Sequence, residues 1–279
     1  MFEPEQTGGK RFPLAGMDGR RLIDMKIHFY RNCTMKFTYG GKTFLLDPMF
    51  RKAGETHELA PTLYPEKPPL TDLPCDPKEI VEGVDAILLT HMHPGHFDQA
   101  AADLIPKTMP FYVQNLNDKD LVRKYNMKKT QTINMTLWTH LDDIRIIRVA
   151  GRHGDGKIQH VLNTMQNSSG ILLEKEGEDT VYITGDSLWC RGMEEGLGAN
   201  PRIIIAYLGY AHGEGMHITM GLYDLQKIAA RCPDAKIVCV HMDTFENQEL
   251  TRAELRNQAD LLGIRDHLII PENGEEFEA

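Results

Sequence analysis

The sequence predicts an α/β protein in which two β-sheets pack face to face and helices cover their outer sides. Two observations support this fold class. Short apolar runs typical of buried strands alternate with helix-forming segments along the 279 residues. Each half of the chain is also rich in strands first and in helices later. Two stacked sheets with helices outside would bury the apolar faces of all these elements.

The first half begins with a β-meander whose second turn contains Gly40 and Gly41. Prolines between about 49 and 77 block regular backbone hydrogen bonding and predict a long loop. The predicted elements of this half are strands at 27–30, 34–38, 43–46, 86–89 and 110–115, and helices at 97–105 and 117–125.

The second half ends with the clearest helix signal of the chain. Thr251 and Glu254 have the spacing of a capping box, and Gly263 follows where such a helix would end. The predicted elements of this half are strands at 143–150, 201–209 and 235–241, a hairpin at 169–186, and helices at 221–232 and about 251–262.

Composition and charge narrow the class of protein. Acidic residues outnumber basic ones by 40 to 31, and the formal net charge of −9 argues against a sequence-independent nucleic-acid binder. No run reaches the roughly 18 apolar residues that span a bilayer, and the first residues lack a signal-peptide pattern. The five cysteines are scattered without a Cys-x-x-Cys pair, so no disulfide framework or thiolate zinc site is indicated. We expect a cytoplasmic protein without membrane or nucleic-acid partners.

Three histidines, His91, His93 and His96, follow the predicted strand at 86–89 within six residues. Residues i and i+2 at a strand end point the same way, so His91 and His93 can face one metal. Other metal-binding residue types stand at or just after the ends of predicted strands elsewhere, namely His153, Asp186 and His241. A single histidine after a strand is usually structural, but this combination favours a metal centre at one edge of the sheets.

Asp47 also ends a predicted strand, and two roles fit it. It could support a metal-binding histidine through a hydrogen bond. Because Pro48 follows, it could instead organise a turn.

Five motifs stand in an order that resembles the metallo-β-lactamase superfamily. They are "LLDP" at 45–48, "THMHPGH" at 90–96, the histidine at 153, "ITGD" at 183–186 and "VHMDTF" at 240–245. The resemblance implies a four-layer αββα sandwich whose two halves form one hydrolase domain at 25–279. Because the first predicted strand starts only after Met25, residues 1–24 are expected to form an N-terminal arm, which makes a homo-oligomer a reasonable expectation. The C-terminal motifs and Asp98, two residues after the third histidine, are similar to the branch that contains ascorbate-6-phosphate lactonase.

The resemblance also implies a ligand set for one or two divalent ions, with zinc or manganese expected first. The implied ligands are His91, His93 and His153 for one metal, His96 and His241 for the second, and Asp186 as a bridge. The family places an additional acid just before the third histidine, but this sequence has Gly95 there. The departure puts the second metal in question and leaves the first intact.

Three arrangements are compatible with Gly95. Asp98 could reach back from the next helix to bind or support the second metal, or it could simply stabilise the helix N-terminus. Substrate or water could complete a weaker site at His96, His241 and Asp186. The enzyme could also use a single metal.

The predicted reaction is hydrolysis. A metal-bound hydroxide, oriented by Asp186, would attack a carbonyl or phosphorus centre, since zinc lowers the pKa of bound water to about 7. The leaving group needs a proton, and we favour His217 as its source over His212 and His160, because His217 lies just before a predicted helix that leads to His241.

The expected substrate is a small-molecule ester, lactone or phosphorylated metabolite, on the resemblance to the lactonase branch. One alternative is a phosphodiesterase or ribonuclease, against which the acidic balance argues. Another is a non-catalytic metal-binding descendant, against which the six retained ligands argue.

Overall fold

The computed structural model describes residues 25–55, 67–134, 139–154, 168–213 and 216–279. The predicted N-terminal arm at 1–24 lies outside the described residues. In the described part, two seven-stranded sheets and a two-stranded ribbon are present. No described helix has both the length and the apolar character that crossing a membrane requires.

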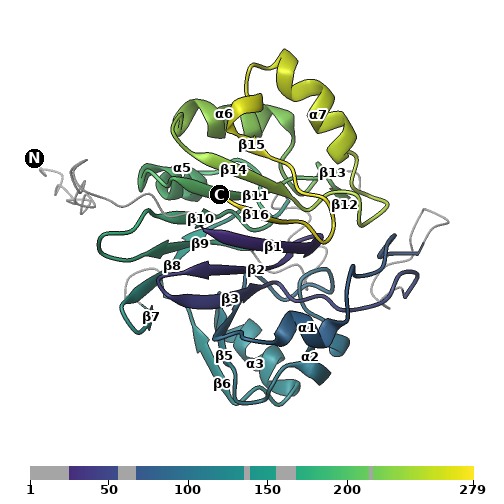
Figure 1. Ribbon diagram of the computed structural model, residues 1–279, viewed down its shortest axis with the longest axis vertical. Helices are drawn as coiled ribbons and strands as arrows, with labels where there is room; N and C mark the ends of the chain where they lie inside the picture. Colours follow the sequence, from purple (N-terminus) through teal and green to yellow (C-terminus); the bar gives the residue numbers. More distant parts are fainter. Residues whose placement is uncertain (1–24, 56–66, 135–138, 155–167, 214–215) are drawn as a thin grey trace, which may run out of the picture.

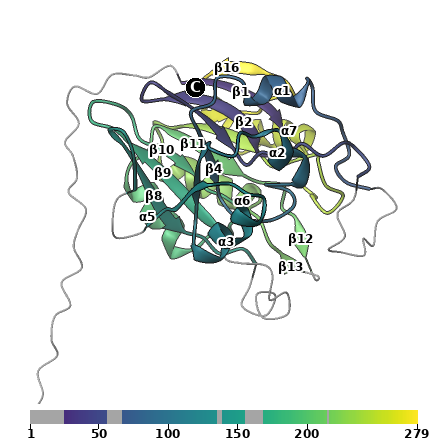
Figure 2. The ribbon, with the colours of Figure 1, turned by 90° about the horizontal axis from the view of Figure 1, so that it is seen from below.

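The first sheet is antiparallel at one side and parallel at the other. Its strand order is β16-β1-β2-β3-β4-β5-β6, and β3 to β6 run parallel. The strands are β1 (Lys26–Arg31), β2 (Thr34–Tyr39), β3 (Lys42–Leu46), β4 (Ala86–Leu89), β5 (Pro110–Val113), β6 (Lys129–Thr132) and β16 (Glu276–Glu278). The C-terminal strand β16 therefore returns to the first half of the chain and pairs with β1 (Figure 2).

The second sheet has the order β15-β14-β11-β10-β9-β8-β7, and β10, β11, β14 and β15 run parallel. Its strands are β7 (Thr139–Leu141), β8 (Ile144–Ala150), β9 (Ser169–Glu174), β10 (Val181–Ile183), β11 (Ile203–Tyr207), β14 (Lys236–Val240) and β15 (Leu268–Ile269). The small ribbon consists of β12 (His212–Gly213) and β13 (Met216–His217).

Helices cover the outer face of each sheet (Figure 1). The first sheet carries α1 (Pro77–Val81), α2 (Gln99–Leu104) and α3 (Leu116–Lys124), and the second carries α5 (Arg191–Gly198), α6 (Leu222–Arg231), α7 (Arg252–Leu261) and the short 3-10 helix η1 (Arg265–His267). This arrangement confirms the predicted four-layer αββα sandwich.

A continuous apolar core lies between the sheets. Phe37 and Leu88 from the first sheet belong to one buried cluster with Ile171, Ile205 and Val238 from the second. Two further clusters join each sheet to its helices. Each fully buried side chain of this size contributes about 1.5–3 kcal/mol to stability. These three apolar clusters hold the strand ends, and therefore the loops that follow them, in fixed positions.

The N-terminal ends of the two helices for which the sequence predicts a start agree with that prediction in one case and differ in the other. Thr251 accepts a hydrogen bond from the Glu254 N–H and Glu254 accepts one from the Thr251 N–H, so the predicted capping box of α7 is confirmed. The prediction that the helix at 117–125 begins with Asn117 is wrong. Asn115 caps α3, because its Oδ1 accepts from the Asp118 N–H at 2.9 Å.

The sequence patterns miss helix α5, since three glycines lie in it or end it and glycine disfavours helix formation. The structure explains two of them. A Cβ atom at Gly192 would collide with the carbonyl oxygen of Ala150, and one at Gly196 would lie 2.7 Å from the ring of Tyr182. The glycines therefore let α5 lie directly against β8 and β10.

Candidate metal centre

All six predicted ligands meet at one edge of the two sheets. His91 and His93 follow β4, and the turn after them carries His96. His153, Asp186 and His241 follow β8, β10 and β14. Parallel strands of one sheet end at the same edge, which is why residues far apart in the sequence gather here. His93 is partly exposed and the other five are buried.

The first group consists of His91, His93 and His153. One ligand atom of each lies within 4.8 Å of those of the others. Nε2 of His91 and Nδ1 of His93 are 2.8 Å apart. Three imidazoles that converge in this way form the ligand type found in catalytic zinc sites.

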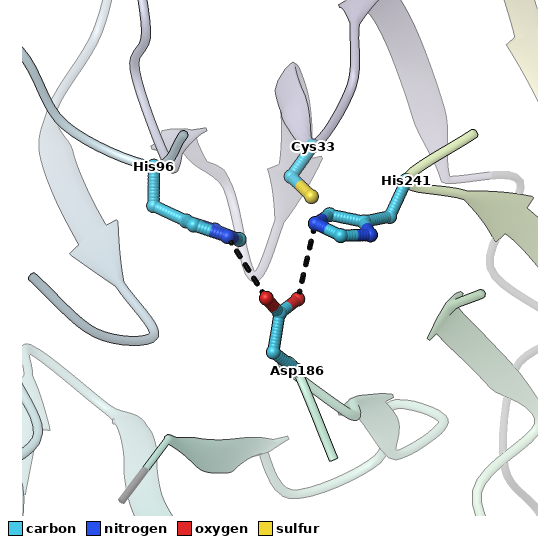
Figure 3. Close-up of side chains that lie close together, drawn as sticks. All are labelled: Cys33, His96, Asp186 and His241. Carbon is cyan, nitrogen blue, oxygen red and sulfur yellow. Dashed lines mark ion pairs between the residues drawn. The ribbon is translucent and has the colours of Figure 1, made fainter. Parts of the chain in front are cut away.

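The second group contains His96, Asp186, His241 and a residue that the sequence analysis did not select, Cys33. Figure 3 shows these four side chains pointing toward one another. Nε2 of His96 and Nε2 of His241 each lie 3.3 Å from an oxygen of Asp186. The Cys33 side chain is fully buried, in the turn between β1 and β2.

The pattern that selected the other residues also applies to Cys33. β1 is antiparallel to β2, and β2 is antiparallel to β3, so β1 ends at the same edge as β3 and β4. Cys33 follows β1 as His91 follows β4. A Cys-x-x-Cys spacing indicates only cysteines that act together, so it does not reveal a thiol that joins histidines.

Asp186 lies between the two groups. Its Oδ2 is 3.7 Å from Nε2 of His91 and 3.8 Å from Nε2 of His153. Among the described residues, its buried Oδ1 accepts no hydrogen bond. A buried carboxylate oxygen without a donor is costly unless a cation satisfies it. This position suits a carboxylate that bridges two metal ions.

Hydrogen bonds fix the orientation of the imidazoles. Nδ1 of His96 lies 2.7 Å from Asp47, Nδ1 of His153 lies 2.9 Å from the carbonyl of Ile218, and Nδ1 of His241 lies 3.2 Å from that of Leu208. A proton on Nδ1 leaves the lone pair of Nε2 free on the opposite side of the ring, toward Asp186.

Asp47 supports the site from behind. It accepts hydrogen bonds from the backbone N–H and the hydroxyl of Thr90, from the hydroxyl of Tyr207 and from His96. The Thr90 hydroxyl in turn lies 3.1 Å from Nδ1 of His91. Of the two roles considered for Asp47, the structure therefore favours the support of ligands.

Burial favours the neutral form of three histidines of the site, His91, His153 and His241. Burial lowers the pKa of His91, and the neighbouring His96 and His93 lower it further. Burial also lowers the pKa values of His153 and His241.

His96 and Asp186 behave differently. Burial disfavours charge on His96, but the carboxylates of Asp186 and Asp47 hold its pKa well above the usual value. Burial likewise opposes ionisation of Asp186, yet His241 and His96 keep its pKa well below normal. The opposite directions of these two pKa shifts reflect the attraction of the buried Asp186 carboxylate for positive charge, which a bound cation would also satisfy.

Asp98 does not join the ligand cluster. Its Oδ1 accepts from the Ala101 N–H and its Oδ2 from the Arg51 N–H, both at 2.8 Å. It therefore caps helix α2 and connects it to the loop after β3. Three arrangements could compensate for the absence of an acid at position 95. The one in which Asp98 binds the second metal directly does not match these contacts.

His217 also lies outside the six-ligand set. Its ring stacks on Tyr210 and on His212, whose Nδ1 is 2.7 Å from Glu249. His212, His217 and Glu249 form a separate, more exposed group on and beside the β12–β13 ribbon. The connection to the ligands runs through Ile218, whose carbonyl accepts from His153. His160, the remaining candidate, lies outside the described residues.

The residues fit divalent metal ions. Neutral imidazoles, a carboxylate and a thiol are the donors that zinc and related first-row metals take from proteins. The outward ring nitrogens are held by hydrogen bonds, and the inward atoms converge on Asp186.

Comparisons with known proteins agree with the fold. Residues 42–242 match the Beta-lactamase superfamily domain. The chain is 30% identical to the UPF0173 protein YddR of Bacillus subtilis strain 168 over 256 residues, which cover 91% of this chain and 99% of that protein. It is also similar to two solved structures. A possible metal-dependent hydrolase from Veillonella parvula has 30% identity and a TM-score of 0.86, and covers 92% of this chain and 100% of its own.

The second structure is an isothiocyanate hydrolase from Delia radicum gut bacteria. It is 31% identical, has a TM-score of 0.84, and covers 91% of this chain and 98% of its own. Fold and site together define a metallo-hydrolase of the beta-lactamase fold. The chain belongs to the Beta-lactamase superfamily and, within it, to the UPF0173 family.

Proposed function

We propose that this protein is a metal-dependent hydrolase that acts on an electrophilic carbon of a small molecule, such as an ester, a lactone or an isothiocyanate. The observation that carries the proposal is the position of Asp186 between two groups of inward-facing histidines. When bound there, divalent ions of the zinc or manganese type would make water nucleophilic near neutral pH. They would also polarise the heteroatom bonded to the electrophilic carbon.

The residues of the chain divide the remaining work. His91, His93 and His153 would hold one ion, and His96 and His241 would hold the other. Asp186 would connect the two, and its carboxylate would accept the proton of an attacking water molecule. Five of these six side chains are buried, so the site excludes most water and strengthens each electrostatic interaction.

Two lines of support bear on the substrate class. The structure named as an isothiocyanate hydrolase shares 31% identity across nearly the whole chain. The motifs near the C-terminus resemble those of the lactonase branch. Isothiocyanates and lactones both carry an electron-poor carbon bonded to heteroatoms and open to attack by water. A carbon electrophile of small size is therefore favoured over a phosphodiester.

Protonation of the leaving group stays a prediction. His217 precedes Ile218, whose carbonyl accepts a hydrogen bond from His153, but the His217 ring is stacked on Tyr210 and His212. A cytoplasmic location and self-association also stay predictions.

A panel of four probes tests the proposal on the full chain loaded with Zn²⁺ or Mn²⁺. The probes are phenyl acetate, dihydrocoumarin, benzyl isothiocyanate and bis(4-nitrophenyl) phosphate. We expect turnover of at least one carbon probe, and a loss of about 100-fold or more in Asp186→Asn because the ligands and the water lose their common partner. Asp120→Asn, an exposed change on α3, is the matched control.

Turnover confined to the phosphate diester would replace the proposal with the phosphodiesterase alternative. A protein that holds metal but turns over none of the four probes would favour the non-catalytic descendant.

A further inference from the structure

We propose that Cys33 is a ligand of the second metal ion and that its thiolate takes the place of the acid that Gly95 removes. The inference rests on the proposed function, because it concerns the same metal centre. It names a residue outside the ligand set that the sequence resemblance implied, and it explains how the second site keeps its charge without an acid at position 95.

The first argument is the position of the sulfur atom. Cys33 is fully buried, and its Sγ lies within 4.8 Å of one ligand atom each of His96, Asp186 and His241. The side chain points toward the other three (Figure 3). One thiolate, two imidazoles and one carboxylate form a four-donor set of the kind that zinc accepts.

The second argument is the turn that carries Cys33. Asn32 precedes it in the left-handed conformation, with φ of 57°, which asparagine tolerates better than most residues. The backbone carbonyl of Asn32 accepts from the His241 N–H at 2.8 Å, and its Nδ2 donates to the Gly95 carbonyl at 3.0 Å. The turn is therefore tied directly to a ligand of the second metal and to the position of the missing acid.

The residue after Cys33 is held equally well. The hydroxyl of Thr34 donates to the Asp47 carbonyl at 2.7 Å and accepts from the Met49 N–H at 3.0 Å. Thr34 is also fully buried. With both neighbours fixed, the thiol is held in place rather than left free to turn away, and such preorganisation is what a metal ligand requires.

The third argument is the space around Gly95. A Cβ atom at this position would lie 3.2 Å from Cζ and 3.3 Å from Cε2 of Phe245, and 3.8 Å from Nδ2 of Asn32. Phe245 and Asn32 thus occupy the region that a longer side chain would enter. A side chain at position 95 would require the Phe245 ring to shift, so the packing disfavours an acid there and favours an anionic donor from another direction.

The charge of the donors supports the replacement of an acid at position 95 by the Cys33 thiolate. A thiolate and a carboxylate each contribute one negative charge, so Cys33 restores the charge that Gly95 removes. Together with Asp186, it would give two anions near two divalent ions. Free buried cysteines elsewhere have different surroundings: the sulfur of Cys232, for example, faces the Leu197 carbonyl in an apolar cluster.

The test is a Co²⁺ titration of the chelator-treated full chain, followed by absorption spectroscopy. A cobalt–thiolate bond gives a sulfur-to-metal charge-transfer band in the near ultraviolet, which nitrogen and oxygen ligands do not give. We expect this band to appear as the second equivalent of Co²⁺ binds. Since the unsubstituted protein is measured, the result does not depend on whether a variant folds.

Variants then assign the band. Cys33→Ser should abolish it, keep the first equivalent of Co²⁺ and weaken the second by at least about 100-fold, more than is typical for the loss of a supporting contact. Cys33→Asp should restore binding of the second equivalent without the band. Cys232→Ser, a change at another buried cysteine, should leave both the band and the stoichiometry unchanged.

Two equivalents of Co²⁺ bound without a charge-transfer band would overturn this inference and leave the proposed hydrolase intact. A band that survives in Cys33→Ser would also overturn it. Failure to bind any Co²⁺ would overturn both the inference and the proposed function.

Discussion

Asp47 shows how one buried carboxylate can organise several groups of the site. It accepts four hydrogen bonds, two from Thr90 and one each from His96 and Tyr207. The carboxylate is fully buried, so each donor has been removed from water and depends on this acceptor. Its backbone adopts φ of 41°, a strained value for an aspartate that the surrounding contacts maintain.

We predict that Asp47→Asn weakens metal binding at His96 while the fold persists. The amide replaces one acceptor oxygen by a donor, so one of two sets of contacts is lost: either the Thr90 N–H, which donates to Oδ1, or His96 and Tyr207, which both contact Oδ2, can no longer be satisfied. Loss of such a supporting contact typically lowers metal affinity about 10–100-fold. Competition with a chelating dye measures the effect. Tyr207→Phe removes a single hydrogen bond and should change the affinity less, and equal affinities for Asp47→Asn and the unsubstituted chain would contradict the supporting role.

At the scale of elements, helix α3 supports the loop at 91–96, which carries three histidines, through a buried acid. Asp118 is fully buried, accepts a hydrogen bond from Gln114 at 2.9 Å and is also bonded to the backbone of Met92, between His91 and His93. Burial raises the pKa of Asp118 to about 6, although these hydrogen bonds oppose the shift. In the unfolded chain an aspartate has a pKa of about 3.9.

The sign of the resulting pH dependence follows from proton binding. Between about pH 4 and 6 the folded state keeps a proton on Asp118 that the unfolded state has released, so Asp118 makes the fold less stable as the pH rises. Relative to Asp118→Asn, which does not titrate, the unsubstituted protein should lose about 1–1.5 kcal/mol between pH 5 and pH 7.5.

Denaturant unfolding of both proteins at the two pH values measures this difference, and using the difference cancels the titration of the histidines. Asp120→Asn, on an exposed position of the same helix, should follow the unsubstituted protein. Parallel pH profiles for Asp118→Asn and the unsubstituted protein would show that burial does not shift this carboxyl.

Elements with strong local patterns could be predicted from the sequence, and elements defined by distant contacts could not. The capping box of α7 and the apolar run of β4 are local signals. The three-residue strand β16 exists because it pairs with β1, some 250 positions away, and α5 exists because glycines let it approach β8 and β10. Neither contact leaves a pattern within a short window of sequence.

The same distinction applies to the site. Six residues were found because each follows a strand that ends at one edge, and the structure brings all six together. Asp98 was considered for the metal because it follows the third histidine by two residues, but its contacts are those of a helix cap. Cys33 was missed because its relation to His96 and His241 depends on how β1, β2 and β3 pair.

On the scale of the whole molecule, the candidate metal centre joins the two halves of the sandwich. Cys33, His91, His93 and His96 follow strands of the first sheet, whereas His153, Asp186 and His241 follow strands of the second. Metal ions at this edge would therefore connect the sheets, and the unfolded chain would lose the arrangement that binds them.

We predict that saturation with Zn²⁺ raises the thermal midpoint. At a free concentration of about 100 times the Kd, binding to the folded state adds about 2.7 kcal/mol. For a chain of this size that corresponds to an increase of about 5 °C. Calorimetry before and after chelation measures the shift. A variant with both His91→Ala and His241→Ala should show little change, and an equal shift in that variant would indicate that Zn²⁺ stabilises the protein elsewhere.

The number of ions per chain tests most directly whether both sheets together hold a centre for two metal ions. We would dialyse the full chain against Zn²⁺ and then against metal-free buffer, and determine zinc by plasma mass spectrometry. The structure predicts two ions per chain, falling to one in Cys33→Ser. One ion or none in the unsubstituted protein would contradict the two-metal centre.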